Sequence, residues 1–158
     1  MSGGMGVRPI LSLRNLSKTF RNGGGPLEIL SGVDLDVAEG ELVCLLGKSG
    51  CGKSTLLRLV AGFLSPDSGS VEVGGERIAG PGPDRCVVFQ EDALFPWLTV
   101  RENVAFGVMR TMPRRVRDAE VRRCLEKVGL EPFGGSLPRE ISGGMKQRVS
   151  IARALSCS

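Results

Sequence analysis

Residues 42–62 read LVCLLGKSGCGKSTLLRLVAG and join a short apolar run to a glycine-rich loop and then to a segment with helical periodicity. The loop satisfies the pattern G-x-x-x-x-G-K-[ST] through Gly47, Gly52, Lys53 and Ser54. This pattern is typical of a loop that binds the phosphates of a nucleotide. An ordinary glycine-rich turn between a strand and a helix is the alternative.

Each residue type in the loop has a chemical reason to be there. Glycines lack a Cβ, so the backbone N–H groups can approach phosphate oxygens closely. Lys53 can reach the β- and γ-phosphates, and the Ser54 hydroxyl is a hard oxygen ligand suited to Mg²⁺. We therefore expect ATP and Mg²⁺ as ligands. The expected nucleotide contacts are Gly47, Lys48, Ser49, Gly50, Cys51, Gly52, Lys53, Ser54 and Thr55.

The sequence around the loop predicts the strand and the helix that such a loop requires. Residues 41–46 form an apolar run typical of a strand covered on both faces. Leu56, Leu57, Val60 and Ala61 follow at helical spacing. We expect a helix directly after the loop, with its N-terminal dipole directed at the phosphates.

A second motif, ISGGMKQR at residues 141–148, precedes the helical segment RVSIARAL at 148–155. Ser142 is a good N-cap, and the two glycines leave backbone amides open at the helix start. The motif resembles the signature of ABC ATPases. The resemblance implies that Ser142, Gly143 and Gly144 contact the γ-phosphate held by a second ATPase subunit in a head-to-tail dimer. The alternative is that Ser142 only caps a surface helix.

The resemblance also implies roles for Gln90 and Phe20. Residues 86–91, CVVFQE, resemble a strand that leads into the family's Q-loop, which implies that Gln90 contacts Mg²⁺ and the attacking water and signals to a transmembrane permease. With Lys53, Gln90 is the expected catalytic residue. Phe20 lies where the family carries an aromatic residue that stacks on adenine, although a phenylalanine is also often part of a core.

The expected fold class is α/β, a P-loop NTPase core of the ABC ATPase type with an antiparallel β flank and a helical insert. We expect one ABC ATP-binding domain over residues 1–158, with the flank and core over about 1–90 and the helical subdomain over about 91–158. Flank strands are predicted at 8–14 and 33–37 with a loop at 21–26, and a hairpin at 70–78. Thr99 and Glu102 form a capping box that opens a helix to about residue 109.

The family pattern continues beyond the signature into an apolar strand ending in Asp, a catalytic Glu and a His. No apolar run ending in Asp-Glu occurs in these 158 residues, and there is no His. We therefore expect the P-loop core to be incomplete at its C-terminal side, before Walker B. A nucleotide-binding remnant or a regulatory chain without hydrolysis stays open as an alternative function.

A finer resemblance lies in GPGPDR at 80–85 and in Pro96-Trp97. Both are similar to the ATP-binding subunits that power import of nitrate, sulfonates and taurine. The resemblance implies a permease as partner and, indirectly, a periplasmic or extracellular substrate-binding protein. Two alternative functions remain. An ABC ATPase that acts on nucleic acid or ribosomes would usually show a second cassette or coiled-coil heptads. A P-loop GTPase or kinase would leave the signature motif unexplained.

The composition of the chain indicates its cellular location. The chain is 41% hydrophobic and 24% charged, and its five cysteines are scattered, which favours reduced thiols in a cytosolic location. Neither a membrane span nor a secretory signal is evident, so we expect a peripheral protein on the cytoplasmic face of the membrane. The basic residues of 110–123 lack aromatic neighbours, which argues against nucleic acid and favours a solvated helix face, with acidic lipids or a membrane partner left open.

Overall fold

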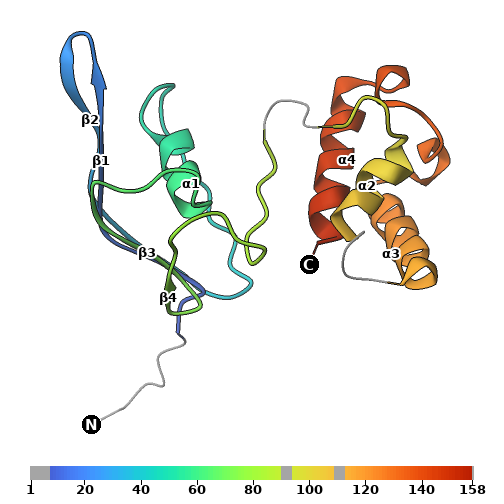
Figure 1. The fold of residues 1–158 in the computed structure, drawn as a ribbon, viewed down its shortest axis with the longest axis horizontal. Helices are drawn as coiled ribbons and strands as arrows, with labels where there is room; N and C mark the ends of the chain where they lie inside the picture. Colours follow the sequence, from blue (N-terminus) through green and yellow to red (C-terminus); the bar gives the residue numbers. More distant parts are fainter. Residues whose placement is uncertain (1–7, 90–93, 109–112, 158) are drawn as a thin grey trace. The chain divides into compact units, whose positions relative to one another are not determined.

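The computed structural model describes residues 8–89, 94–108 and 113–157 (Figure 1). The chain separates into two compact units, Met1–Arg85 and Cys86–Ser158, and each is described by itself. The expected division near residue 90 into a core and a helical subdomain remains a prediction. In the described part of the chain, no helix combines the length and the apolar character needed to cross a membrane.

Unit 1 contains a four-stranded antiparallel sheet with the order β2-β1-β3-β4. The strands are β1 (Leu11–Asn22), β2 (Gly25–Val37), β3 (Ser68–Val73) and β4 (Glu76–Arg77). The expected antiparallel flank and the hairpin around residues 74–75 are confirmed. The loop predicted at 21–26 is mostly strand, because Arg21 pairs with Pro26 and Asn22 with Gly25 across a two-residue turn.

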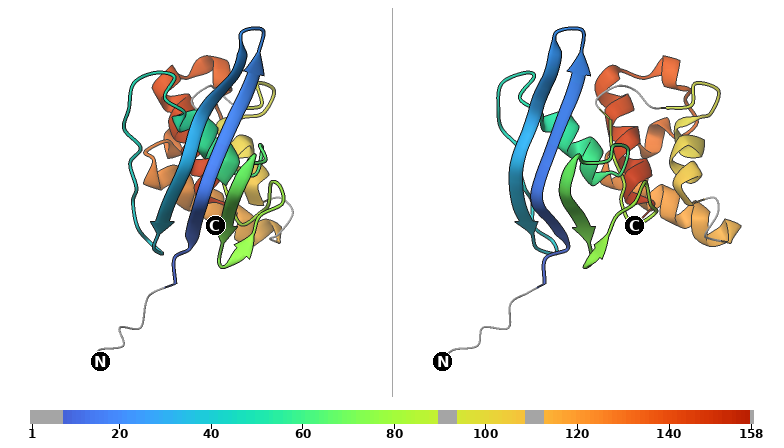
Figure 2. Two further views of the ribbon diagram at one scale, coloured as in Figure 1. Left: turned by 90° about the vertical axis from the view of Figure 1, so that its left-hand side faces the viewer. Right: turned by 60° about the vertical axis from the view of Figure 1, so that its left-hand side comes forward.

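The helix predicted after the glycine-rich loop is confirmed as α1 (Lys53–Val60), which lies against one face of the sheet (Figure 2). Its buried side of Leu56 and Leu59 packs on sheet residues Leu13, Leu16, Leu30 and Val71. Leu57, which we expected to share the apolar side, is 55% exposed. This packing fixes the axis of α1 and therefore the position of its first turn.

The strand predicted at residues 41–46 is wrong. This segment is not part of a sheet, and Leu42 and Leu46 are 88% and 92% exposed. A strand of a buried sheet needs hydrogen-bonding neighbours on its edges. Among the described residues, the sheet of unit 1 is formed by β1–β4, and none of them pairs with 41–46. The same correction applies to the strand expected from Cys86, since residues 86–89 pair with no strand in the described chain.

The described residues of unit 2 form three packed helices, α2 (Val100–Val108), α3 (Arg114–Lys127) and α4 (Gly143–Leu155), with short 3-10 turns at Glu131–Phe133 and Pro138–Glu140. Its core is apolar and includes Val100, Val104, Val121, Leu125, Leu130, Val149 and Ala152. The capping box is confirmed, because the Thr99 N–H donates to Glu102 Oε2 at 2.8 Å and the Glu102 N–H donates to Thr99 Oγ1 at 3.2 Å.

Candidate nucleotide site

The N-terminus of α1 is open to an anion. Gly52 precedes the helix with φ 95° and ψ 0°, and no side chain caps the first turn. The first turn also carries no acidic residue. Uncapped N–H groups and the positive end of the helix dipole both favour a bound phosphate.

Two glycines of the loop lie close to neighbouring residues. A Cβ on Gly52 would lie 3.0 Å from both Ile29 Cγ2 and Leu30 Cδ2, in a backbone region that side chains rarely adopt. A Cβ on Gly47 would lie 2.6 Å from Cys51 Sγ. The loop therefore lies close to β2 at Gly52 and turns back on itself between Gly47 and Cys51.

The Lys53 side chain turns back over the loop. Its Nζ donates to the carbonyl oxygens of Gly47 and Lys48, each at 2.8 Å, and lies 3.6 Å from Cys51 Sγ. The loop thus holds a positive charge beside the uncapped end of α1. An anion bound to the α1 N–H groups would meet the ammonium group of Lys53 without a rearrangement of the helix.

The remaining loop residues lie together in unit 1. Ser54 is exposed and Thr55 is half-buried in the first turn of α1, while Lys48, Ser49, Gly50 and Cys51 are exposed. The described residues contain no cluster of three or more His, Cys, Asp or Glu side chains that could hold a metal. The Ser54 hydroxyl is the oxygen ligand that the loop offers to Mg²⁺, and that role stays a prediction.

Phe20 lies in β1, half-buried, with Lys18 Nζ 5.8 Å from the centre of its ring. It is not among the residues that form or pack against the core of unit 1. The structure therefore does not support its alternative role as a core residue. Stacking of Phe20 on adenine stays a prediction.

The signature motif opens α4 in unit 2 as predicted. Ser142 is the N-cap, and its Oγ accepts a hydrogen bond from the Met145 N–H at 3.3 Å. Ser142, Gly143 and Gly144 are exposed, a Cβ on either glycine would meet no atom within 4 Å, and the first turn has no acidic residue. This helix start can accept an anion without displacing another side chain.

Gln90 lies outside the described residues, so its role stays a prediction. The segment that leads to it is held against α4, because Gln147 Nε2 donates to the Phe89 carbonyl oxygen at 3.4 Å.

Sequence reasoning missed the residue that organises the turn after this segment. Asn103 in α2 is completely buried, and its Oδ1 accepts from the Phe95 N–H at 2.8 Å. Its Nδ2 donates to the carbonyl oxygens of Phe95, Leu98 and Thr99 at 2.9–3.1 Å. A polar residue at an apolar position of α2 was the available signal, since a buried amide must satisfy its donors and acceptor.

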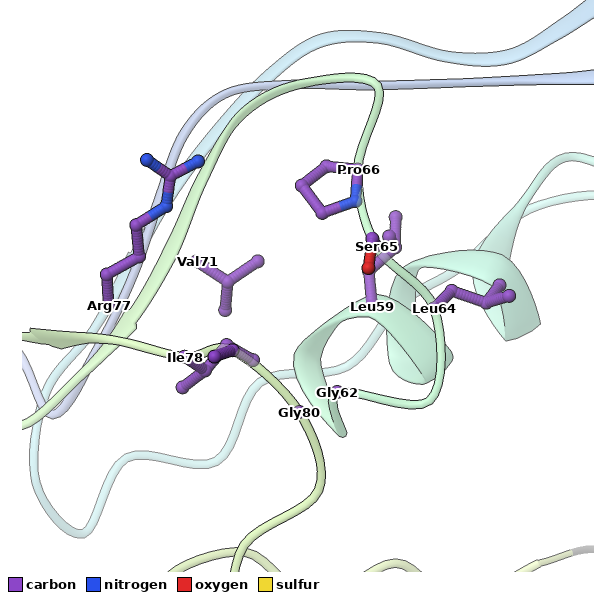
Figure 3. Close-up of a pocket in the computed structure, with 10 residues that line it drawn as sticks. Leu59, Gly62, Leu64, Ser65, Pro66, Val71, Arg77, Ile78 and Gly80 are labelled. Atoms are coloured by element: carbon purple, nitrogen blue, oxygen red, sulfur yellow. The ribbon is translucent and has the colours of Figure 1, made fainter.

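A small pocket of unit 1 lies at the other end of α1 (Figure 3). It has a volume of about 190 Å³ and is lined by side chains that include Leu59, Leu64, Val71 and Ile78. The Arg77 guanidinium at its edge donates to the Gly69 carbonyl oxygen at 3.1 Å. Because this pocket adjoins the C-terminal end of α1, it is separate from the phosphate-binding loop.

The fold and the two helix-start motifs define an ABC ATPase cassette, and comparison with known proteins agrees. The family described as ABC transporter matches residues 30–158, so the chain belongs to that family. It is 52% identical over 149 residues to the bicarbonate transport ATP-binding protein CmpD of Synechocystis sp., an alignment that covers 92% of this chain and 52% of the relative. It is 50% identical over 147 residues to the taurine import ATP-binding protein TauB of Roseobacter denitrificans, covering 92% of this chain and 55% of the relative.

Solved structures show the same fold. The ATP-binding cassette MJ0796, in a dimeric post-hydrolysis state bound to ADP and Pi, superposes with a TM-score of 0.81 at 33% identity. The match covers 92% of this chain and 69% of that structure. The P-loop NTPase fold class is thereby confirmed. The chain spans about half the length of the curated relatives that it matches.

Proposed function

We propose that the chain is the ATP-binding part of an ABC importer subunit, which binds ATP with Mg²⁺ and uses its hydrolysis to drive uptake of a small solute. The observation that carries this proposal is the uncapped start of α1 with the Lys53 ammonium held beside it. The relatives named for bicarbonate and taurine transport support a small anion or sulfonate as cargo, with nitrate in the same class.

Each expected site residue has a separate role in binding or hydrolysing the nucleotide. The backbone N–H groups of residues 47–55 bind and orient the phosphates, and Lys53 neutralises charge on the β- and γ-oxygens. Ser54 supplies one oxygen to Mg²⁺, which when bound offsets the charge that develops during phosphoryl transfer. Gln90 positions the attacking water. Phe20 stacks on the adenine ring and so fixes the orientation of the nucleotide.

The signature helix acts on a second subunit. Ser142, Gly143 and Gly144 form an exposed helix start that suits the γ-phosphate of a nucleotide held by a partner in a head-to-tail dimer. A dimeric relative supports this arrangement. The other partners are a transmembrane permease and, through it, a substrate-binding protein outside the membrane. The subunit is peripheral, on the cytoplasmic face.

ATP binding by the purified chain tests the phosphate site. Lys53→Ala removes the ammonium from the loop and should reduce ATP affinity at least tenfold, since a charge-assisted contact contributes about 1.5–3 kcal/mol. Arg58→Ala removes an exposed cation from the last turn of the same helix and is the matched control, with affinity unchanged. Equal ATP affinity in Lys53→Ala and the wild type would reject the site.

Hydrolysis is measured on the same samples. Phosphate release that is lost in Lys53→Ala supports an ATPase. Tight, Lys53-dependent ATP binding without phosphate release supports instead the nucleotide-binding or regulatory alternative.

A further inference from the structure

Two cysteines of unit 2 lie next to each other although they come from distant parts of the sequence. Cys86 begins the segment that leads to Phe89, and Cys157 follows the last turn of α4. The Cys157 thiol is one of the groups that act on the Cys86 thiol, so the two side chains are neighbours. Both residues are exposed, so a small reagent can reach them.

A second contact also places the segment of residues 86–89 beside α4. Gln147, in the first half of α4, donates to the Phe89 carbonyl oxygen at 3.4 Å. Cys86 meets Cys157 at the far end of the same helix. Residues 86–89 therefore run along α4 in the opposite direction.

The backbone at Cys157 is anchored from α2. Ser156 is 2% exposed, and its Oγ donates to the Val104 carbonyl oxygen at 3.0 Å. A Cβ on Gly107 would lie 2.8 Å from Cys157 Sγ, so α2 approaches this end of α4 closely. Cys157 Sγ itself donates to the carbonyl oxygens of Arg153 at 3.3 Å and Gly107 at 3.6 Å. The Cys157 thiol therefore lies between α2 and the last turn of α4.

We propose that Cys86 and Cys157 form a redox modification site that closes to an intrachain disulfide by exchange with a low-molecular-weight disulfide such as oxidised glutathione. In the first step the thiolate of one cysteine attacks a glutathione sulfur, the glutathione S–S bond breaks, and one glutathione thiol leaves. In the second step the other cysteine attacks the mixed disulfide and releases the second glutathione thiol. The two cysteines lose two electrons and two protons, and one glutathione disulfide becomes two thiols.

The surroundings predict how fast the pair closes. Partial desolvation and then the neighbouring Cys157 raise the pKa of the Cys86 thiol, while the Arg153 guanidinium acts in the opposite direction. Because only the thiolate attacks, exchange at Cys86 is slow near neutral pH and accelerates as the pH rises. Closure is then a response to sustained oxidation.

The bridge would act on the segment before Gln90. It would tie residue 86 to the end of α4, whose start carries Ser142, and so restrict movement of the segment relative to that helix. This consequence rests on the proposed function, whereas the disulfide itself does not.

The test uses the full chain, oxidised glutathione at graded ratios to reduced glutathione, alkylation of free thiols, and mass spectrometry after trypsin. Each cysteine lies on its own tryptic peptide: 22–48, 49–53, 86–101, 124–127 and 154–158. We expect the pair 86–101 with 154–158 to be the predominant linkage under native conditions and to lose that predominance in urea. The linkage would be overturned if it formed no more often in native buffer than in urea, or if both cysteines ended only as mixed disulfides.

Two variants sharpen this result. Cys86→Ser should abolish the linkage and leave Cys157 as a mixed disulfide with glutathione. Cys44→Ser removes an exposed cysteine of unit 1 and should leave the 86–157 linkage at its wild-type yield. An equal fall in both variants would overturn the assignment. ATP affinity of the reduced chain is measured in parallel, so failure of the disulfide is distinguished from failure of the nucleotide site.

Discussion

The phosphate-binding loop of unit 1 and the signature turn of unit 2 use the same device and support it differently. Each is a glycine-rich turn that opens a helix with no acidic residue in its first turn. Ser142 caps its helix, which also packs Val149 and Ala152 into the core of unit 2. The loop before Lys53 has no side-chain cap, and the segment that feeds it, 41–46, has no sheet partner in the described chain.

Neighbouring residues in the sequence are sufficient to specify the signature turn but not the strand expected before the phosphate-binding loop. A capped helix satisfies its backbone hydrogen bonds within its own residues and needs neighbours only for its buried face. A strand in a buried sheet does not, because its backbone groups and both of its faces need neighbours from elsewhere. The exposed Leu42 and Leu46 mark this dependence.

The largest effect is expected at Asn103, whose amide joins α2 to residues 95–99 of unit 2. Asn103→Ala leaves buried donors and acceptors without partners, each costing about 1–3 kcal/mol, so we expect a loss of about 4 kcal/mol in the free energy of unfolding. Urea unfolding followed by the fluorescence of Trp97 measures this, since Trp97 is the single tryptophan and lies in unit 2.

Gln147→Ala is the control for Asn103, because that amide makes one long hydrogen bond at 3.4 Å to Phe89. Its expected cost is about 0.5 kcal/mol or less. Equal losses in the two variants would show that the buried network does not support unit 2.

The next largest loss of stability is expected in the loop of unit 1, where a glycine can be needed for its positive φ or for the lack of space for a Cβ. Gly50 and Gly52 both have positive φ, 83° and 95°, but only at Gly52 would a Cβ meet neighbours, namely Ile29 and Leu30. Gly50→Ala should cost about 1–2 kcal/mol through backbone strain alone. Gly52→Ala should cost about 3 kcal/mol, since contact strain of about 1–3 kcal/mol adds to the backbone cost.

Hydrogen exchange of the amides in α1 and β2 measures both glycine variants in unit 1. A Gly52→Ala variant no less protected than Gly50→Ala would mean that the loop does not rest on β2 as described.

The sequence predicted those parts of the fold that short-range chemistry specifies. The Thr99–Glu102 capping box, the Gly74-Gly75 hairpin and the Ser142 cap each involve residues within a few positions of one another. The strands at 41–46 and 86–89 were predicted from apolar runs, which report burial but not the identity of a pairing strand. Asn103 was not predicted, although its partners at residues 95–99 are near in sequence, because the apolar pattern does not show the turn that its amide supports. The Cys86–Cys157 contact was not predicted because it depends on how distant segments pack.

A smaller effect on stability is expected at Ser142, where variants can separate its role as a helix cap from its proposed role in anion binding. Ser142→Ala should lower the stability of unit 2 by about 1 kcal/mol, measured by Trp97 fluorescence in urea, because the Met145 N–H loses its acceptor. Ser142→Asp keeps a good cap and should retain wild-type stability. Under the proposed function, both variants lose ATP-driven dimerisation in light scattering, the aspartate through repulsion of the γ-phosphate. If Ser142→Asp, with wild-type stability, still dimerised on addition of ATP, the role of Ser142 would be that of a structural cap only.

The smallest effect compares one carboxylate from each unit. The pKa of Asp67 is lowered mainly by a hydrogen bond from Lys18 Nζ at 2.8 Å and then by the Thr19 N–H at 2.7 Å. The pKa of Glu102 is lowered by the Thr99 N–H and hydroxyl, with no cation among the causes. A lowered pKa means that each carboxylate stabilises its unit above its unfolded-state pKa and loses that contribution as pH falls through the folded-state value.

The two sources of these pKa shifts respond differently to salt and to mutation. Added salt screens exposed charges, so it should raise the pKa of Asp67 towards its ordinary value and change Glu102 less. Lys18→Met should raise the pKa of Asp67 and leave that of Glu102 unchanged, as followed by NMR titration of the carboxyl carbons. If salt moved both values equally, the ion pair would not account for Asp67, and the two units would hold their carboxylates by the same backbone hydrogen bonds.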